Sequence, residues 1–180
     1  MRGREERGYT LIELLIVVSL LVLIAAIAIP AFSGDDEATL DQAAAQVASV
    51  FRFAHGEAVR TGQPYGVSAN LASQWVKVYR LDESVSPPVA VYDVYDPVTR
   101  QLYDLSFGGD SEPSISNIYF KFDGFFFAQT FLGFAGATGV PKFNDAGTIR
   151  MLEDGYIRLN HDGMTRTIAV SPMTARVTVH

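Results

Sequence analysis

The first 30 residues constrain the fold of this 180-residue chain more than any other stretch. Every residue from 14 to 29 is apolar except Ser19, and Pro30 ends the run. One carboxylate, Glu13, lies just inside the front of the run. Three arginines precede it: Arg2, Arg4 and Arg7. This segment is therefore expected to form a long apolar helix with one charge, and such a helix requires surroundings other than water.

The length of this segment matches a lipid bilayer. Residues 9–29 would form a helix of roughly 31 Å, and the hydrocarbon core of a bilayer is about 30 Å thick. Arginines before the run, and a formal net charge of −6 for the chain, predict a cytoplasmic N-terminus and an external C-terminal domain. The alternatives are a plain signal anchor and a secretory signal peptide, whose apolar region is only about 7–15 residues. Neither alternative explains Glu13, since a carboxylate at the bilayer centre costs about 2.5–3.5 kcal/mol.

The spacing of four residues resembles the class III signal of type IV pilins and type II secretion pseudopilins. Gly8 precedes Tyr9, Glu13 is the fifth residue counted from Tyr9, and Pro30 is the twenty-second. The resemblance implies that a prepilin peptidase cleaves between Gly8 and Tyr9 and that the new amine of Tyr9 is N-methylated. It also implies that Glu13 aligns subunits as their helices assemble. Tyr9 is a departure, since the family usually has Phe there.

A physical reason exists for the carboxylate at that position. Glu13 lies one helical turn from the amine that cleavage would free at Tyr9. A pair of amine and carboxylate would neutralise both charges within an apolar helical core. Pro30 has no N–H and clashes with the carbonyl of Ala26, so a kink or a break in the helix is expected there. An equally good reading is that Pro30 marks the membrane exit.

A second helix is predicted after a polar break at residues 33–37. Its apolar residues are spaced 4, 3, 4, 3 and 4 apart, as on one narrow face of an amphipathic helix. They are Leu40, Ala44, Val47, Phe51, Ala54 and Ala58. Gly62 suits the C-terminal cap, and Gly56 inside the helix is a weak point.

Beyond Gly62 the pattern changes to strands. Short runs rich in valine and aromatic residues predict strands at 65–69, 75–81 and 118–122. Two more, at 90–95 and 101–105, flank a predicted type I turn at 96–99. The last three, at 156–160, 164–170 and 176–179, read as an antiparallel meander. The fold class expected is α+β, with a long N-terminal helix packed on antiparallel sheet.

The whole pattern resembles the minor pseudopilins of the GspH/FimT type. The segments that carry the resemblance are residues 54–58, 75–81, the turn at Asp96 and Pro97, 143–147 and 166–170. Two departures are that His55 stands where the family often has Arg, and that residues 173–176 lack the usual Gly. The domains implied are a leader at 1–8, a transmembrane and assembly helix at 9–30, its amphipathic continuation at 31–62 and a β domain at 63–180.

The resemblance implies a structural subunit of a type II secretion pseudopilus in the bacterial inner membrane, with a single pass and a periplasmic domain. Its partners would be prepilin peptidase, other pilins or pseudopilins, and an inner-membrane assembly platform. The alternative in the same family is a FimT-like minor pilin for pilus biogenesis or DNA uptake. The acidic charge argues against nucleic-acid binding. DNA binding that survives about 150 mM salt would favour the DNA-uptake alternative.

No enzymatic chemistry is indicated. The chain has no cysteine and only three histidines, so thiol catalysis and thiolate metal sites are excluded. No nucleophile with its base, phosphate loop or pair of catalytic carboxylates stands out. We expect no cofactor and no metal. The alternative from another class, an anchored periplasmic enzyme, predicts that Glu13→Ala is harmless.

An unusual cluster of phenylalanines occupies residues 120–134. Packing in the core is the simplest interpretation, but three consecutive phenylalanines cannot all face one side of a strand. Some of these three residues are therefore candidates for a contact surface with a subunit or substrate: Phe125, Phe126 and Phe127.

Three weaker candidates have simpler readings. Asp93, Asp96 and Asp104 could approach one another around calcium, but a solvated acidic edge is favoured. The sequence His161-Asp162-Gly163 is foremost a turn. Four arginines in the closing part of the chain could form a basic face, although surface solubility is the preferred reading: Arg150, Arg158, Arg166 and Arg176.

Overall fold

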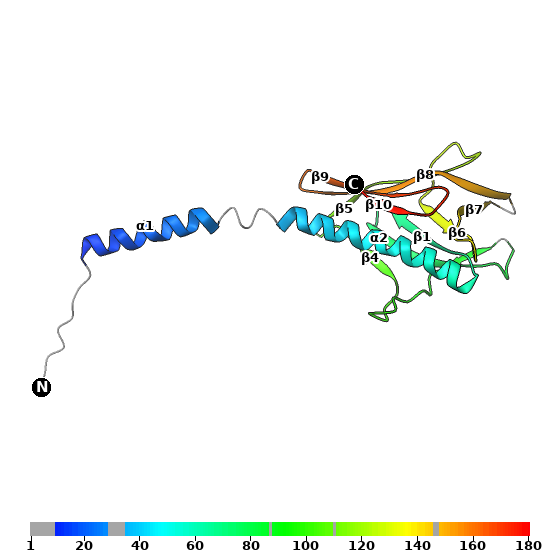
Figure 1. The fold of residues 1–180 in the computed structure, drawn as a ribbon, viewed down its shortest axis with the longest axis horizontal. Coiled ribbons are helices and arrows are strands. Elements are labelled where there is room, and N and C mark those ends of the chain that lie inside the picture. The colour runs from blue at the N-terminus through cyan, green and yellow to red at the C-terminus, as the bar shows by residue number, and fades with distance from the viewer. Residues whose placement is uncertain (1–9, 29–34, 87, 110, 146–147) are drawn as a thin grey trace, which may run out of the picture. The chain divides into compact units, whose positions relative to one another are not determined.

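A computed structural model describes residues 10–28, 35–86, 88–109, 111–145 and 148–180 (Figure 1). Gly8, Tyr9 and Pro30 lie outside these described residues. The chain divides into two compact units, residues 1–36 and 37–180. The second unit contains a helix packed on antiparallel sheet, which confirms the predicted α+β class.

The first unit contains α1 (Leu11–Ala28). Large apolar side chains point outward all around α1, and between Leu11 and Ile24 their exposed fractions run from 51% to 82%. The single hydroxyl of α1, on Ser19, donates to the carbonyl oxygen of Leu15 at 2.8 Å and is thereby satisfied within the helix. Among the described residues, no helix has both the length and the hydropathy of a membrane span.

The second helix, α2 (Asp35–Thr61), forms where the apolar spacing predicts it. All six predicted face residues are fully buried, but the expectation of a narrow face is wrong. Ala43, Ala48 and Val50 are buried as well. Together these residues cover about 160° of the helix, compared with about 100° for an ordinary amphipathic helix. The face is wide because α2 contacts two halves of the sheet.

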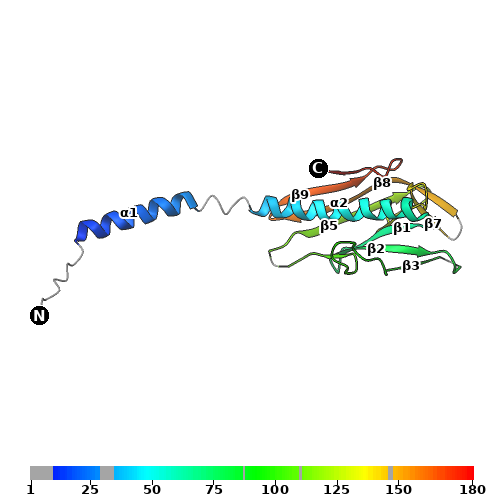
Figure 2. The same ribbon diagram turned by 60° about the horizontal axis from the view of Figure 1, so that its bottom comes forward.

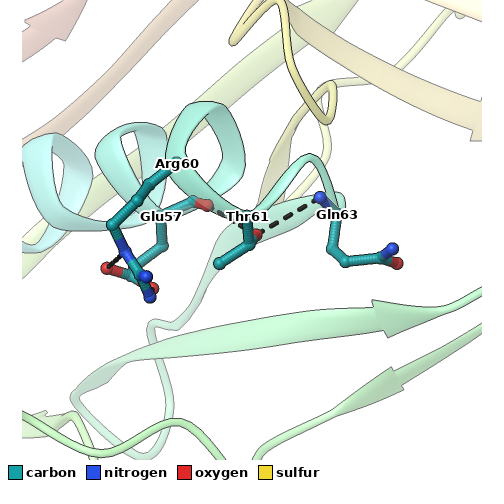
Figure 3. Close-up of polar contacts among 4 residues, drawn as sticks. All are labelled: Glu57, Arg60, Thr61 and Gln63. Carbon is teal, nitrogen blue, oxygen red and sulfur yellow. Dashed lines mark hydrogen bonds and ion pairs between the residues drawn. The ribbon is translucent and has the colours of Figure 1, made fainter.

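Gly62 ends α2 as predicted, with φ of +71° and its N–H donating to the carbonyl oxygen of Ala58 at 3.1 Å. Figure 3 shows the last turn. The Thr61 hydroxyl donates to the Glu57 carbonyl oxygen at 2.7 Å and accepts from the Gln63 N–H at 3.2 Å. The Glu57 carboxylate pairs with Arg60 at 2.6 Å, which raises the pKa of the Arg60 guanidinium.

The strands form one continuous antiparallel sheet with two halves that share β8 (Thr148–His161). The first half contains β1 (Tyr65–Asn70), β2 (Trp75–Asp82), β3 (Val89–Val91), β4 (Asp104–Ser106), β6 (Phe131–Phe134) and β7 (Pro141–Asp145). The second half contains β5 (Ser114–Phe122), β9 (Met164–Val170) and β10 (Val177–Val179). The early part of β8 pairs with β7, and its later part pairs with β5 and β9.

A bulge lies in β8 near the point where its partners change from β7 to β5 and β9. Lys121 and Phe122 pair with Asp154 and Leu152, so the register between β5 and β8 shifts by one residue there. Beside the bulge, Gly155 faces Phe120, and a Cβ at this position would lie 2.9 Å from the Phe120 ring. The strand therefore needs glycine for the ring to pack where the two halves of the sheet meet.

The core lies where α2 covers both halves of the sheet. In Figure 2, α2 crosses in front of the sheet, with β8 and β9 on one side of it and β2 and β3 on the other. Val47 and Phe51 of α2 belong to one buried cluster together with Val78 of the first half and Ile157 of the second. Burial of these side chains supplies the main driving force for folding.

The predicted strands at 65–69, 75–81 and 118–122 and the closing meander are confirmed. The hairpin predicted at 90–105 forms only next to its turn, where Tyr95 pairs with Leu102 and the Tyr103 N–H donates to the Val94 carbonyl oxygen at 2.8 Å. β3 and β4 do not pair with each other, because both pair with β2 at different positions along its outer edge. Residues 92–103 leave the sheet between them. The predicted turn is also wider, since the Arg100 N–H donates to the Asp96 carbonyl oxygen across four residues.

Two strands, β6 and β7, are not predicted from the sequence. Both are short, and each contains a residue that weakens a strand pattern, Gly133 in β6 and Pro141 in β7. They fill the centre of the sheet, since β6 pairs with β1 and β7 pairs with β8. Long-range pairing therefore decides their conformation rather than local preference.

Gly56 is exposed in the interior of α2, and a Cβ built there meets nothing within 4 Å. We expect Gly56→Ala to stabilise the protein by about 0.5–1 kcal/mol, because alanine loses less backbone entropy in a helix. Thermal unfolding followed by circular dichroism measures this change. Gly62→Ala is the matched control, and it should destabilise because its φ is +71°.

The side chain of Gln74 closes the edge of β5. Its Oε1 accepts from the Ile115 N–H at 2.6 Å, and its Nε2 donates to the carbonyl oxygens of Ile115 at 3.1 Å and Leu71 at 2.6 Å. The amide thus takes the place of a neighbouring strand, and it links the loop before β2 to the second half of the sheet.

Gln74→Ala should destabilise the folded protein by about 1–3 kcal/mol, since it leaves the buried backbone groups of Ile115 without partners. The free energy of unfolding in urea tests this expectation. Gln63→Ala is the control, because the exposed Gln63 side chain has no described hydrogen bond. Equal stabilities of the two variants would show that the Gln74 amide does not hold the β5 edge.

Candidate functional site

Glu13 takes part in a reciprocal cap at the start of α1. Its Oε2 accepts from the Thr10 N–H at 3.0 Å and from the Thr10 hydroxyl at 3.2 Å. In return, the Thr10 Oγ1 accepts from the Glu13 N–H at 3.3 Å. This arrangement is a capping box, in which the side chains of the N-cap residue and the third helical residue satisfy each other's backbone donors.

The cap fixes where α1 begins relative to the predicted cleavage point. Thr10 is the N-cap residue, so the bond between Gly8 and Tyr9 precedes the first helical residue, Leu11. Both bonds to Thr10 use Oε2 of Glu13, and within the described residues no hydrogen bond occupies Oε1. The carboxylate therefore faces the N-terminal side of the helix with one oxygen available.

Sequence reasoning missed Thr10, although a signal was present. The letters Thr10-Leu11-Ile12-Glu13 fit the Thr-x-x-Glu pattern of a capping box directly before an apolar run.

The second candidate site is an aromatic loop, residues 123–130, between β5 and β6. The three phenylalanines are not in a strand, because β5 ends at Phe122. Phe126 is 97% exposed and Phe127 is 81% exposed, whereas Phe125 is half-buried. The structure therefore separates one supporting phenylalanine from two that face solvent.

The loop is held at its base by several contacts. The N–H of Gln129 donates to the Phe120 carbonyl oxygen at 2.7 Å, which closes the loop. Asp123 Oδ1 accepts from the Met151 N–H at 2.9 Å. The Arg150 guanidinium lies 4.9 Å from the centroid of the Phe125 ring and donates to the Asp123 carbonyl oxygen at 3.1 Å. The exposed rings thus project from an ordered support.

The double substitution of Phe126 and Phe127 to Ser should leave the thermal midpoint within about 2 °C of the parent, because exposed surface positions change stability by less than about 0.5 kcal/mol. Phe125→Ser is the control, and it should destabilise through lost packing on Phe143, whose ring centroid lies 5.7 Å away. Loss of soluble folding in the double variant would contradict a role for these rings in contacts with other molecules.

The three aspartates considered for calcium do not converge. Asp93 pairs with Arg80 at 2.8 Å, and Asp104 pairs with Lys77 at 2.8 Å. Asp96 accepts from the Val98 N–H at 2.8 Å and caps its own turn. Within the described residues, no three metal-ligating side chains lie close enough together to hold an ion.

The four arginines of the closing part serve local contacts. Arg166 bonds Asp41 at 2.6 Å and Glu37 at 2.8 Å on α2, and these hydrogen bonds raise the pKa of its guanidinium. Arg158 lies over the ring of Tyr156, with 5.4 Å to its centroid. Arg150 supports the aromatic loop as described above, and Arg176 is exposed.

His55 and His161 both lie in structural parts of the domain, a helix and a turn. His55, on α2, meets the ring of Phe134 edge to face, with 5.6 Å between the centroids. Residues 161–163 form the predicted turn between β8 and β9, with φ of +48° at Asp162 and +80° at Gly163. Two consecutive positive φ values are typical of the tight hairpin turn that this sequence favours.

Residues 3–29 match the prokaryotic N-terminal methylation motif, and residues 43–175 match the type II transport protein GspH family. The fold is similar to the minor pseudopilin EpsH from the type 2 secretion system of Vibrio cholerae, with a TM-score of 0.51 and 11% identity over 78% of this chain and 96% of that one. A search of curated protein sequences gives no match.

An apolar helix that carries the methylation motif, followed by a helix packed on antiparallel sheet, defines a subunit of the pilin-like class. The chain belongs to the GspH family of type II transport proteins. The resemblance to GspH-type pseudopilins that the sequence shows is therefore confirmed. The roles of Gly8, Tyr9, Glu13 and Pro30 remain predictions.

Proposed function

We propose that this protein is a minor pseudopilin of a type II secretion system, a structural subunit that assembles through α1. The observation that carries the proposal is the match to the GspH family together with the N-terminal methylation motif. The role is mechanical: the chain contributes a helix to a filament and presents its β domain there. No substrate is transformed in this role.

The surface of α1 supports storage in the inner membrane before assembly. A helix with apolar side chains on all sides is stable only within lipid or among other apolar helices. Residues 9–30 are the proposed single pass, with Pro30 as the point where the helix bends or leaves the bilayer. The arginines before it set the N-terminus in the cytoplasm, and the β domain at 63–180 faces the periplasm.

Processing by prepilin peptidase is proposed to remove residues 1–8. The capping box supports this step, because it starts the helix at Leu11, two residues after the proposed new N-terminus at Tyr9. Tyr9 then carries the free amine that is methylated.

Glu13 is proposed to set the register of α1 in the filament. Its free Oε1 can accept the Tyr9 amine while Oε2 keeps the cap, and either the same subunit or a neighbour can provide the amine. An unpaired charge in an apolar bundle costs several kcal/mol, so subunits would settle where carboxylate and amine meet. Other pseudopilins and the inner-membrane assembly platform are the proposed partners.

The test is filament incorporation of the full chain in a secreting cell, with leader cleavage read in parallel from mobility on a gel. Glu13→Ala should be cleaved normally and yet fall about tenfold or more in the filament fraction. Glu6→Ala, in the leader, is the matched control and should incorporate as the parent does.

Two further variants separate the cap from the charge. Glu13→Gln keeps a capping side chain but loses the charge, and Thr10→Ala loses the cap but keeps the charge. We expect Glu13→Gln to fail like Glu13→Ala, whereas Thr10→Ala retains most incorporation. Full incorporation of Glu13→Gln would overturn the pairing of carboxylate and amine, and unaltered incorporation of Glu13→Ala would overturn the assembly role itself.

A further inference from the structure

A groove of about 220 Å³ lies on the first half of the sheet and is lined mainly by apolar and aromatic residues. Its floor includes Ser68 of β1, Tyr79 of β2 and Gly133 of β6. Residues alternate between the faces of a strand, and the neighbours Val67, Val78 and Leu132 are part of the core with α2. The groove is therefore on the face that α2 does not cover.

A row of residues across four strands shapes the floor. Tyr79 pairs with Gly66, Gly66 with Gly133, and Gly133 with Lys142. The Tyr79 ring lies directly on Gly66, where a Cβ would collide with the ring, and its hydroxyl reaches to 3.4 Å from the Cβ position of Gly133. Two glycines thus give the tyrosine room to lie flat along the sheet and leave open space above.

Two hydroxyls in this floor have no described partner. Tyr79 is only 7% exposed and Ser68 only 8%, and neither side chain makes a hydrogen bond within the described residues. Burial raises the pKa of the Tyr79 hydroxyl, so it stays protonated and can donate. Among the described residues no fully buried side-chain oxygen lacks a partner, so these two oxygens are accessible from the groove, where a peptide group of a bound segment could reach them.

The size of the groove indicates the kind of occupant. Sites for small molecules and cofactors usually measure about 300–1,000 Å³, so this groove suits a single large apolar side chain on a polypeptide. The exposed strand β3 forms one wall through Ala90, next to Tyr92. An approaching segment would therefore find an apolar slot with hydrogen-bonding groups at its bottom.

The chain itself exposes such side chains. Phe126 and Phe127 are the aromatic residues with the highest exposure among the described ones, at 97% and 81%. Residues 124–130 carry no charge, so their burial requires no desolvation of an ion. Phe125 fixes the loop from below through Arg150 and Phe143, so the two exposed rings are presented with little loss of backbone freedom.

We propose that the groove over Gly66 and Gly133 binds the aromatic loop of a second copy of this chain, with Phe126 or Phe127 inserted above Tyr79. The contact places an exposed ring in apolar surroundings, and backbone groups of the loop bond the hydroxyls of Ser68 and Tyr79. The proposal rests on the assembly role proposed above, because filaments bring β domains of neighbouring subunits together.

Cysteine cross-linking of the full chain in cell membranes tests this contact, since the chain has no cysteine of its own. Two copies with tags of different size are co-expressed, one with Ala90→Cys at the groove wall and one with Ala128→Cys beside the intact phenylalanines. Oxidation should give the mixed dimer several-fold more often than a control pair of Ala128→Cys with Met173→Cys. Met173 is 85% exposed and lies outside the groove lining.

Substitution of Phe126 and Phe127 by Ser in the Ala128→Cys copy should lower the mixed dimer to the control level. A mixed dimer equal to the control, or one that persists without the two rings, would overturn the groove contact. Leader cleavage and filament incorporation, measured on the same samples, report on the proposed function separately. Normal values there together with no specific cross-link would refute the groove contact alone.

Discussion

The contact between Phe51 and Phe120 joins α2 to the sheet within the core of the β domain. Their rings meet edge to face with 6.0 Å between the centroids, and both are fully buried. Phe51 comes from α2, whereas Phe120 lies on β5 opposite Gly155, beside the bulge of β8. The contact therefore anchors the helix where the sheet changes from one half to the other. The alanines around Phe51 let the helix approach closely enough for this packing.

Residues close in sequence made much of the fold predictable. The spacing of apolar residues located α2, Gly62 located its end, and the turn residues Asp162 and Gly163 located the last hairpin, because each signal acts within one helical turn or one tight turn. The hairpin between 90 and 105 is shorter than predicted, because beyond the pairing of Tyr95 with Leu102 the outer edge of β2 pairs with both segments. No local pattern contains that choice.

The cap at Glu13 and the groove over Gly66 also differ in how far the sequence alone predicts them. Glu13 and Thr10 are three residues apart, so their relation could be read from the letters, and even the missed cap left a visible pattern. The groove depends on Gly66, Tyr79 and Gly133, which come together only through the pairing of β1 with β2 and β6. When one strand is considered alone, a glycine in it indicates a weak strand. Two paired glycines beneath a tyrosine instead form a surface. Sequence reasoning could not find this site because β6 itself was not visible.

The cap also explains why a carboxylate suits position 13 better than any other capping group. An amide could satisfy Thr10 equally well, but it would bring no charge to the amine that the proposed cleavage would free at Tyr9. A carboxylate has two oxygens, and only Oε2 is engaged by Thr10. The same side chain can thus start the helix in the unprocessed chain and neutralise the amine afterwards, without giving up its first partner. The cost of a charge in an apolar segment is then offset at both stages, which a plain membrane anchor would not require.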